Sequence, residues 1–108
     1  MATVSLTTMC VLCAKAFQAE TTCLALLEKG YDNKDLEKGV LKISQKAHNT
    51  YLALRDKVAN SCDDGQMMLE ILDWESYTQA GNEMAKSDYA IDDVINTLLD
   101  IRNAGFEI

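Results

Sequence analysis

Proline is absent from this chain of 108 residues, and Phe, Trp and Tyr together make up only 6% of it. A β-sandwich of this length would need many tight turns and many aromatic or β-branched residues in its strands. Long helices need neither, and proline would interrupt them. Hydrophobic residues make up 48% of the chain and charged residues 25%, which is typical of a folded globular domain. The composition therefore predicts an all-α fold.

The sequence also lacks any linker, internal repeat or low-complexity stretch, so we expect residues 1–108 to form a single domain. A chain of this length buries enough surface to fold around one core without a structural metal, cofactor or disulfide. No basic segment precedes the apolar N-terminal residues, as an export signal requires, and no apolar run approaches the roughly 20 residues that span a bilayer. We expect a cytoplasmic protein with reduced thiols and no membrane partner.

Basic residues are scarce in the C-terminal part of the chain, and the net charge of −7 is concentrated there. Residues 63–108 contain eleven acidic residues but only two basic ones, Lys86 and Arg102. Phosphate binding depends on Lys and Arg replacing counterions, so this distribution argues against a nucleic-acid partner. It fits two other roles, which are keeping the protein in solution and attracting a basic protein.

Regularly spaced apolar residues predict four helices, which we expect to form an antiparallel bundle. The first covers about Val4–Lys29 and ends at Gly30, a residue that suits the C-terminal stop of a helix. Either Asp32 or Asn33 is expected to cap the second helix, which ends near Ser61. Its inward stripe has the rhythm of a bundle helix and consists of Leu36, Val40, Ile43, Ala47, Tyr51, Leu54 and Val58.

The last two predicted helices lie in the acidic part of the chain. The third covers about Gln66–Lys86 and is apolar over more than half of its circumference. Such a helix packs on more than one side, as a central helix does or one that also covers a dimer surface. Ser87-Asp88 is expected to cap the fourth, which ends at Gly105, and Phe106 is expected to fold back onto it. Its predicted inward residues are Ile91, Val94, Ile95, Leu98 and Ile101.

Four cysteines are present, and two of them form a Cys10-x-x-Cys13 pair. A zinc ribbon needs a second such pair, and thioredoxin-type chemistry needs a strand before the pair, whereas these residues fall within a predicted helix. Residues at positions i and i+3 of a helix also have poor geometry for a disulfide. We therefore predict that all four cysteines, including Cys23 and Cys62, are structural thiols, and we expect no bound metal.

His48 is the only histidine, and it follows Ala47 in the second predicted helix. In a small acidic helical bundle this pair resembles the phosphoacceptor region of histidine phosphotransfer domains, which implies phosphoryl transfer through His48. The motif of that family continues with a lysine and a glycine, where this chain has Tyr51 and Leu52. Without these two residues the imidazole is crowded and a phosphoryl group lacks a neighbouring cation. We therefore predict that His48 is a surface residue.

Two pairs of carboxylates indicate a different activity: Glu70 and Asp73 on one face of the third helix, and Asp92-Asp93 at the start of the fourth. Paired carboxylates on antiparallel helices are what a Mg²⁺-dependent phosphohydrolase uses to hold metal and substrate phosphates. Together with the run Ile91–Gly105, they resemble the all-α nucleotide pyrophosphohydrolases of the MazG kind. The second motif of that family is Glu-x-x-Asp, and Ala90 occupies the glutamate position here. The other interpretation is that the aspartates stabilise the positive end of a helix dipole.

Because no catalytic set is complete, the sequence favours binding over chemistry. We predict a non-enzymatic protein-binding domain (an inhibitor, immunity protein, adaptor or oligomeric structural protein), with the MazG-like enzyme and the phosphotransfer domain as alternatives. The expected partner is another protein, basic in charge, or a second copy of this chain. Trp74 and Tyr77 are the candidate anchors of an interface, although Trp74 also suits the core of the monomer. The acidic residues expected around these anchors are Glu70, Asp73, Glu75, Asp92, Asp93 and Asp100.

Overall fold

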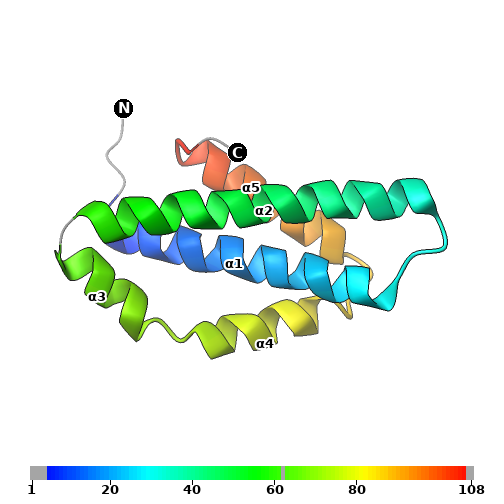
Figure 1. Cartoon of the computed structure of the whole chain (residues 1–108), viewed down its shortest axis with the longest axis horizontal. Coiled ribbons are helices and arrows are strands. Elements are labelled where there is room, and N and C mark those ends of the chain that lie inside the picture. Colours follow the sequence, from blue (N-terminus) through cyan, green and yellow to red (C-terminus); the bar gives the residue numbers. More distant parts are fainter. Residues whose placement is uncertain (1–4, 62, 107–108) are drawn as a thin grey trace.

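The computed structural model describes residues 5–61 and 63–106, and these residues form five helices and no strand (Figure 1). The helices are α1 (Leu6–Lys29), α2 (Lys34–Ser61), α3 (Asp63–Ile71), α4 (Trp74–Met84) and α5 (Ala90–Asn103). The predicted all-α class is therefore confirmed. The predicted ends of the first two helices, at Lys29 and near Ser61, are also those of α1 and α2.

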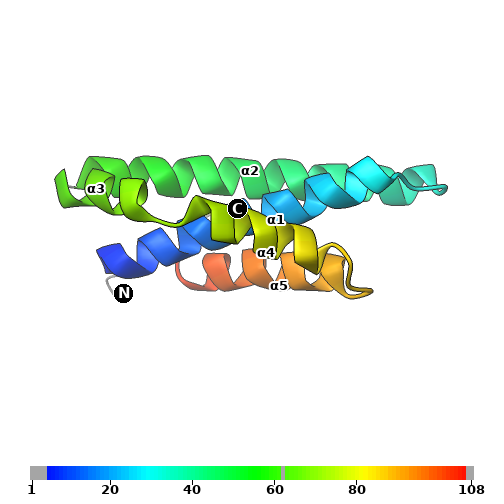
Figure 2. The ribbon, with the colours of Figure 1, turned by 90° about the horizontal axis from the view of Figure 1, so that it is seen from below.

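Helix α1 lies at the centre of the molecule and packs against α2, α4 and α5 (Figure 1, Figure 2). Both α2 and α5 run antiparallel to α1, so these two helices point in the same direction (Figure 1). Small side chains allow the neighbouring helices to approach α1 closely, and its buried residues are Cys10, Leu12, Cys13, Ala14, Ala16, Ala19, Thr22 and Cys23. Burial of this helix on several sides is the basis of the fold.

By length and composition alone, α1 is long and apolar enough to cross a membrane. The expectation that no segment approaches this length and hydropathy is therefore wrong. In the structure the other helices cover the apolar surface of α1 on several sides, and the core helix of a globular protein meets the same criterion.

A glycine allows α4 to lie close to α1. The backbone of Gly81 faces α1 so closely that an added Cβ would lie 2.8 Å from the Cβ of Thr21. At this short approach the buried hydroxyl of Thr22 donates a hydrogen bond of 2.9 Å to the Gly81 carbonyl. A polar contact as well as apolar packing therefore sets how the two helices align.

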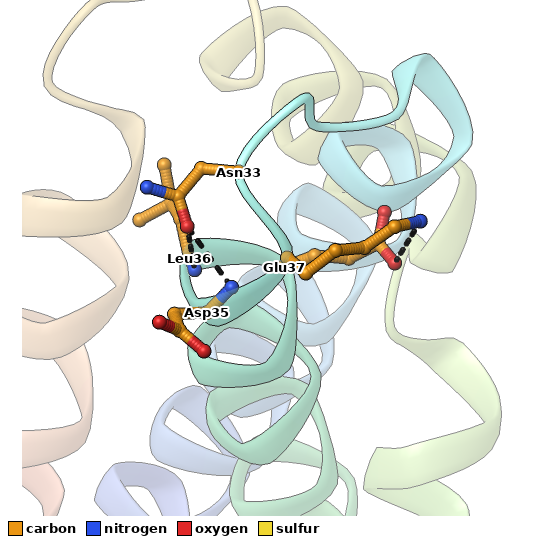
Figure 3. A network of polar contacts seen from close by, with 5 residues as sticks. Asn33, Asp35, Leu36 and Glu37 are labelled. Carbon is orange, nitrogen blue, oxygen red and sulfur yellow. Dashed lines mark hydrogen bonds and ion pairs between the residues drawn. The ribbon is translucent and has the colours of Figure 1, made fainter.

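The turn between α1 and α2 contains both of the predicted helix-ending signals. Gly30 has a φ of +83°, a left-handed conformation that favours glycine, and its N–H donates to the carbonyl of Leu27. The Asn33 side-chain oxygen accepts hydrogen bonds from the N–H groups of Asp35 and Leu36, at 2.9 and 3.1 Å (Figure 3). Of the two predicted caps, Asn33 is the one that the structure uses.

The prediction of one helix over residues 66–86 is wrong, because the chain breaks into α3 and α4 ahead of Asp73. The Asp73 carboxylate caps α4 by accepting hydrogen bonds from the N–H and the hydroxyl of Ser76, at 3.1 and 2.9 Å. Both hydrogen bonds lower the pKa of the Asp73 carboxyl below its usual range, and the bond from the Ser76 N–H has the larger effect. The Trp74 indole N–H donates to the Leu69 carbonyl, near the end of α3 where carbonyls lack helical partners. The wide apolar surface therefore belongs to two helices rather than to one.

The predicted cap of α5 at Ser87-Asp88 is wrong, because the residue before its first turn is Tyr89, which forms no side-chain cap hydrogen bond. Helix α5 ends as predicted. Gly105 has a φ of +103°, and the N–H groups of Gly105 and Phe106 donate to the carbonyls of Arg102 and Ile101. This pair of bonds is a Schellman motif, and it folds Phe106 back so that its ring packs against the core. The predicted inward residues of α5 are buried or half-buried except Ile95, whose side chain is 38% exposed.

Candidate functional site

Trp74, for which the sequence allowed either an interface or a core position, lies in an aromatic cluster within the monomer. Its ring packs edge-to-face on Phe17 of α1 and Tyr51 of α2, at centroid distances of 5.2 and 5.9 Å. The rings of Phe17 and Tyr51 are themselves 5.4 Å apart. Aromatic pairs with this geometry attract one another beyond the effect of burial. The cluster therefore joins α1, α2 and α4, and Trp74 packs against the core.

The other residues predicted around Trp74 are divided between α3 and α4. Glu70 is exposed on α3 and lines, with Trp74, a cavity of about 550 Å³. Glu75 is exposed in the first turn of α4, and Tyr77 in the same helix is half-buried. The structure therefore brings Glu70 and Trp74 together, whereas the carboxylate of Asp73 is turned to the cap of α4.

Two of the three acidic residues predicted on α5 line a different cavity. Asp93 and Asp100 lie beside a polar cavity of about 280 Å³ between α1 and α5, which Lys15 also lines. Asp92 is exposed. Glu70 and Trp74 therefore line one cavity, and Asp93 and Asp100 line another.

Within residues 5–61 and 63–106, no group of three or more His, Cys, Asp or Glu side chains could hold a metal ion. Glu70 and Asp73 were predicted to share one helical face, but the break between α3 and α4 separates them. The carboxylates on which the resemblance to MazG-type enzymes depends are therefore not gathered at one place in this part of the chain.

His48 lies on the surface of α2, as predicted, and its imidazole pairs with a carboxylate of α1. Its Nδ1 is 2.8 Å from a carboxylate oxygen of Glu20, and the His48 side chain is 48% exposed. Tyr51 takes no part in this pair because its ring belongs to the aromatic cluster. The group beside the imidazole is thus a carboxylate, whose charge would repel a phosphoryl group.

The three cysteines that the structure describes are buried free thiols in α1, as predicted, while Cys62 lies outside the described residues. Burial raises the pKa of Cys13 to about 12 and that of Cys23 to about 11, and it also raises the pKa of Cys10. Thiols of this kind stay protonated at neutral pH and react slowly, because the thiolate is the nucleophile. Their environment is that of core residues.

We expect the free energy of unfolding to fall as the pH rises above about 9. Below the ordinary thiol pKa of 9.0 the cysteines are protonated in both the folded and the unfolded state. Above pH 9 the thiols ionise in the unfolded state, while Cys13 and Cys23 keep their protons in the folded state. This difference lowers the free energy of unfolding by up to about 1.4 kcal/mol per pH unit for each thiol. Urea titrations between about pH 8 and pH 10 measure this slope. The Cys13→Ala/Cys23→Ala variant should show a shallower slope, and an unchanged one would contradict the expectation.

An open, apolar groove lies between α2 and α5. Both helices lie on the upper side of α1 in Figure 1, and Figure 2 shows them separated, with few contacts between them. The space between them holds a cavity of about 700 Å³, lined by Ile43, Lys46, Ile95, Leu98, Leu99, Arg102, Gly105 and Phe106. A second cavity of about 270 Å³ shares the last two residues and is otherwise lined by Thr50, Ala53, Leu54 and Lys57. We refer to the two together as the α2–α5 groove.

The α2–α5 groove was not predicted from the sequence. Ile95 was predicted to be buried, but its side chain is 38% exposed in the groove wall. Leu99, which lies outside the predicted inward stripe, is 42% exposed in the same wall. Leu99 beside the inward stripe was a signal, since it widens the apolar face of α5 beyond what one neighbouring helix covers. Comparison with protein-family models, curated proteins and solved structures found no match to this chain.

Proposed function

We propose that this chain is a non-enzymatic, acidic protein-binding domain and that its partner docks in the α2–α5 groove. The observation that supports this proposal is the uncovered apolar surface between two helices that both pack on α1. A contiguous apolar surface is unfavourable in water and commonly marks an interaction site. An inhibitor, immunity protein or adaptor would use such a groove to cover part of its partner.

A helix suits this groove because α2 and α5, which form the walls of the groove, point in the same direction. Helices α2 and α5 both run antiparallel to α1 (Figure 1). A partner helix placed between them and parallel to α1 would complete a bundle of four alternating helices with α1, α2 and α5. Its apolar stripe would then cover the exposed parts of Ile95, Leu99 and Phe106, which is the usual mode of helix-in-groove recognition.

Leu99→Asp is expected to abolish co-purification of the partner, because it places a carboxylate in the apolar wall of the groove. The fold should tolerate this change, since the Leu99 side chain is 42% exposed. Leu24→Asp is the matched control, on a leucine that is 52% exposed on α1 and outside the groove. Tagged forms of the wild type and both variants would be produced in the native host, and the bound proteins compared by quantitative mass spectrometry. Loss from both variants, or from neither, would contradict the proposal.

A further inference from the structure

We infer that the partner segment in the α2–α5 groove is an acidic amphipathic helix. This inference rests on the proposed function and specifies the chemistry of the partner. The charged residues that line the groove are Lys46, Lys57 and Arg102, all of them cationic. Among the described residues no carboxylate lines either cavity of the groove, although the whole chain has 17 acidic and only 10 basic residues. The charged side chains that the structure describes in the groove are therefore opposite in sign to the net charge of the protein.

Within the described residues, none of these three cations pairs with a carboxylate. In the described part of the chain, the basic residues that pair with a carboxylate are others, namely Lys34, His48 and Lys86. Lys57 extends over the ring of Phe106, with its Nζ 4.9 Å from the ring centre, at one end of the groove. Lys46 lines the groove from α2 and Arg102 lines it from α5, so the apolar floor has a cation on each side. A docked helix with acidic residues on both flanks of its apolar stripe would meet both cations.

The walls of the groove also indicate the length of the segment. The lining residues of α2 run from Ile43 to Lys57, a distance of about 21 Å at 1.5 Å per helical residue. A partner helix of about 14 residues, or four turns, would match this length. Apolar residues at i, i+3, i+4 and i+7 would place one stripe against Leu98 and Leu99 and leave the flanking positions beside the cations.

Charge argues against two other occupants of the groove, a basic segment and a second copy of this chain. The expectation of a basic partner depended on the acidic residues of 63–108, and none of those that the structure describes lines the groove, where a basic segment would meet Lys46, Lys57 and Arg102. A second copy docked groove to groove would bring Lys46 and Arg102 against the same residues of its twin, because a two-fold interface places equivalent patches together. Like charges brought together in this way disfavour the complex.

A display library of amphipathic helices of about 16 residues tests this inference. Every member carries the same leucine stripe, while the flanking positions are randomised among Glu, Lys and Gln. Selection on the full-length protein is expected to enrich Glu at the flanks. The enriched peptides should bind the Lys46→Glu/Arg102→Glu variant at least about tenfold more weakly. The Lys34→Glu/Lys38→Glu variant makes the same change in net charge at exposed positions outside the groove, and it should keep its affinity.

Three results would overturn the inference. They are enrichment of Lys or of no charge at the flanks, an equal loss of affinity in the two charge-reversed variants, and no enrichment of any helix. The proposed function is tested separately by the Leu99→Asp co-purification. A native partner that requires Leu99 would therefore leave the proposed function standing even where the peptides show no preference for acidic flanks.

Discussion

Trp74→Ala is expected to lower the free energy of unfolding by about 3–5 kcal/mol. The indole packs edge-to-face on Phe17 and Tyr51, and its N–H donates a 2.9 Å hydrogen bond to the Leu69 carbonyl. Its removal would leave a cavity where α1, α2 and α4 meet and an acceptor without its partner. This loss is a large part of the total stability of a small domain. Urea denaturation followed by circular dichroism measures it.

Trp74→Phe is the matched control for the same site. It keeps an aromatic ring in the cluster but removes the indole N–H, so we expect a smaller loss of about 1–2 kcal/mol. The competing interpretation makes Trp74 an interface anchor. In that case Trp74→Ala would change the stability by less than about 1 kcal/mol and would weaken partner binding by about 2 kcal/mol or more, which would contradict the position of Trp74 in the core.

Gly65→Ala is expected to destabilise the protein by about 3 kcal/mol or more. Gly65 is buried in the first turn of α3, and a Cβ added to it would overlap the carbonyl oxygen of Val58 in α2. Because both groups belong to the backbone, no change of rotamer relieves the overlap, and α3 must move away from α2. Thermal and urea unfolding of the variant would measure the loss.

Gly39→Ala provides a control of opposite sign. Gly39 lies within α2, and a Cβ added there would meet nothing within 4 Å. Alanine at such a position is expected to stabilise the helix by about 0.5–1 kcal/mol, since glycine is the poorer helix former. Equal effects of the two substitutions would show that helix propensity, and not the close approach of α3 to α2, decides the outcome.

Local signals were sufficient to predict the helices that have clear ends. Gly30 ends α1 because the backbone there has a φ of +83°, which glycine adopts readily. Asn33 caps α2 because its side-chain oxygen accepts hydrogen bonds from two backbone N–H groups. The Gly105 turn and the return of Phe106 to the core were predicted in the same way. Each of these features depends on residues near one another in the sequence, which is why the sequence alone indicated them.

The break between α3 and α4 was missed because its signal has two interpretations. The apolar residues of 66–86 form two stripes, a pattern that predicts one helix packed on two sides. In the structure they belong to two helices in different directions, with Asp73 starting the second (Figure 1). Asp73 followed at the third position by Ser76 was an N-cap signal within the predicted helix. The carboxylate was instead assigned to a possible metal pair with Glu70.

The α2–α5 groove could not be predicted because it arises from tertiary packing. Its walls depend on how far apart α2 and α5 sit on α1, and no local pattern in the sequence specifies that distance. Ile95 was predicted to lie in the core, and Lys46 lies outside the inward stripe predicted for the second helix. Only the packed structure shows that they line the same surface.

Site-specific photo-crosslinking tests the central claim, that the partner docks in the α2–α5 groove, most directly. A benzophenone amino acid replaces Leu99 in the groove wall, and in a second form of the protein it replaces Leu24 outside the groove. After irradiation in the native host, we predict one dominant crosslinked protein from position 99 that is absent or weak from position 24. Equal crosslinking from both positions, or a partner captured only from position 24, would contradict the docking of the partner in this groove.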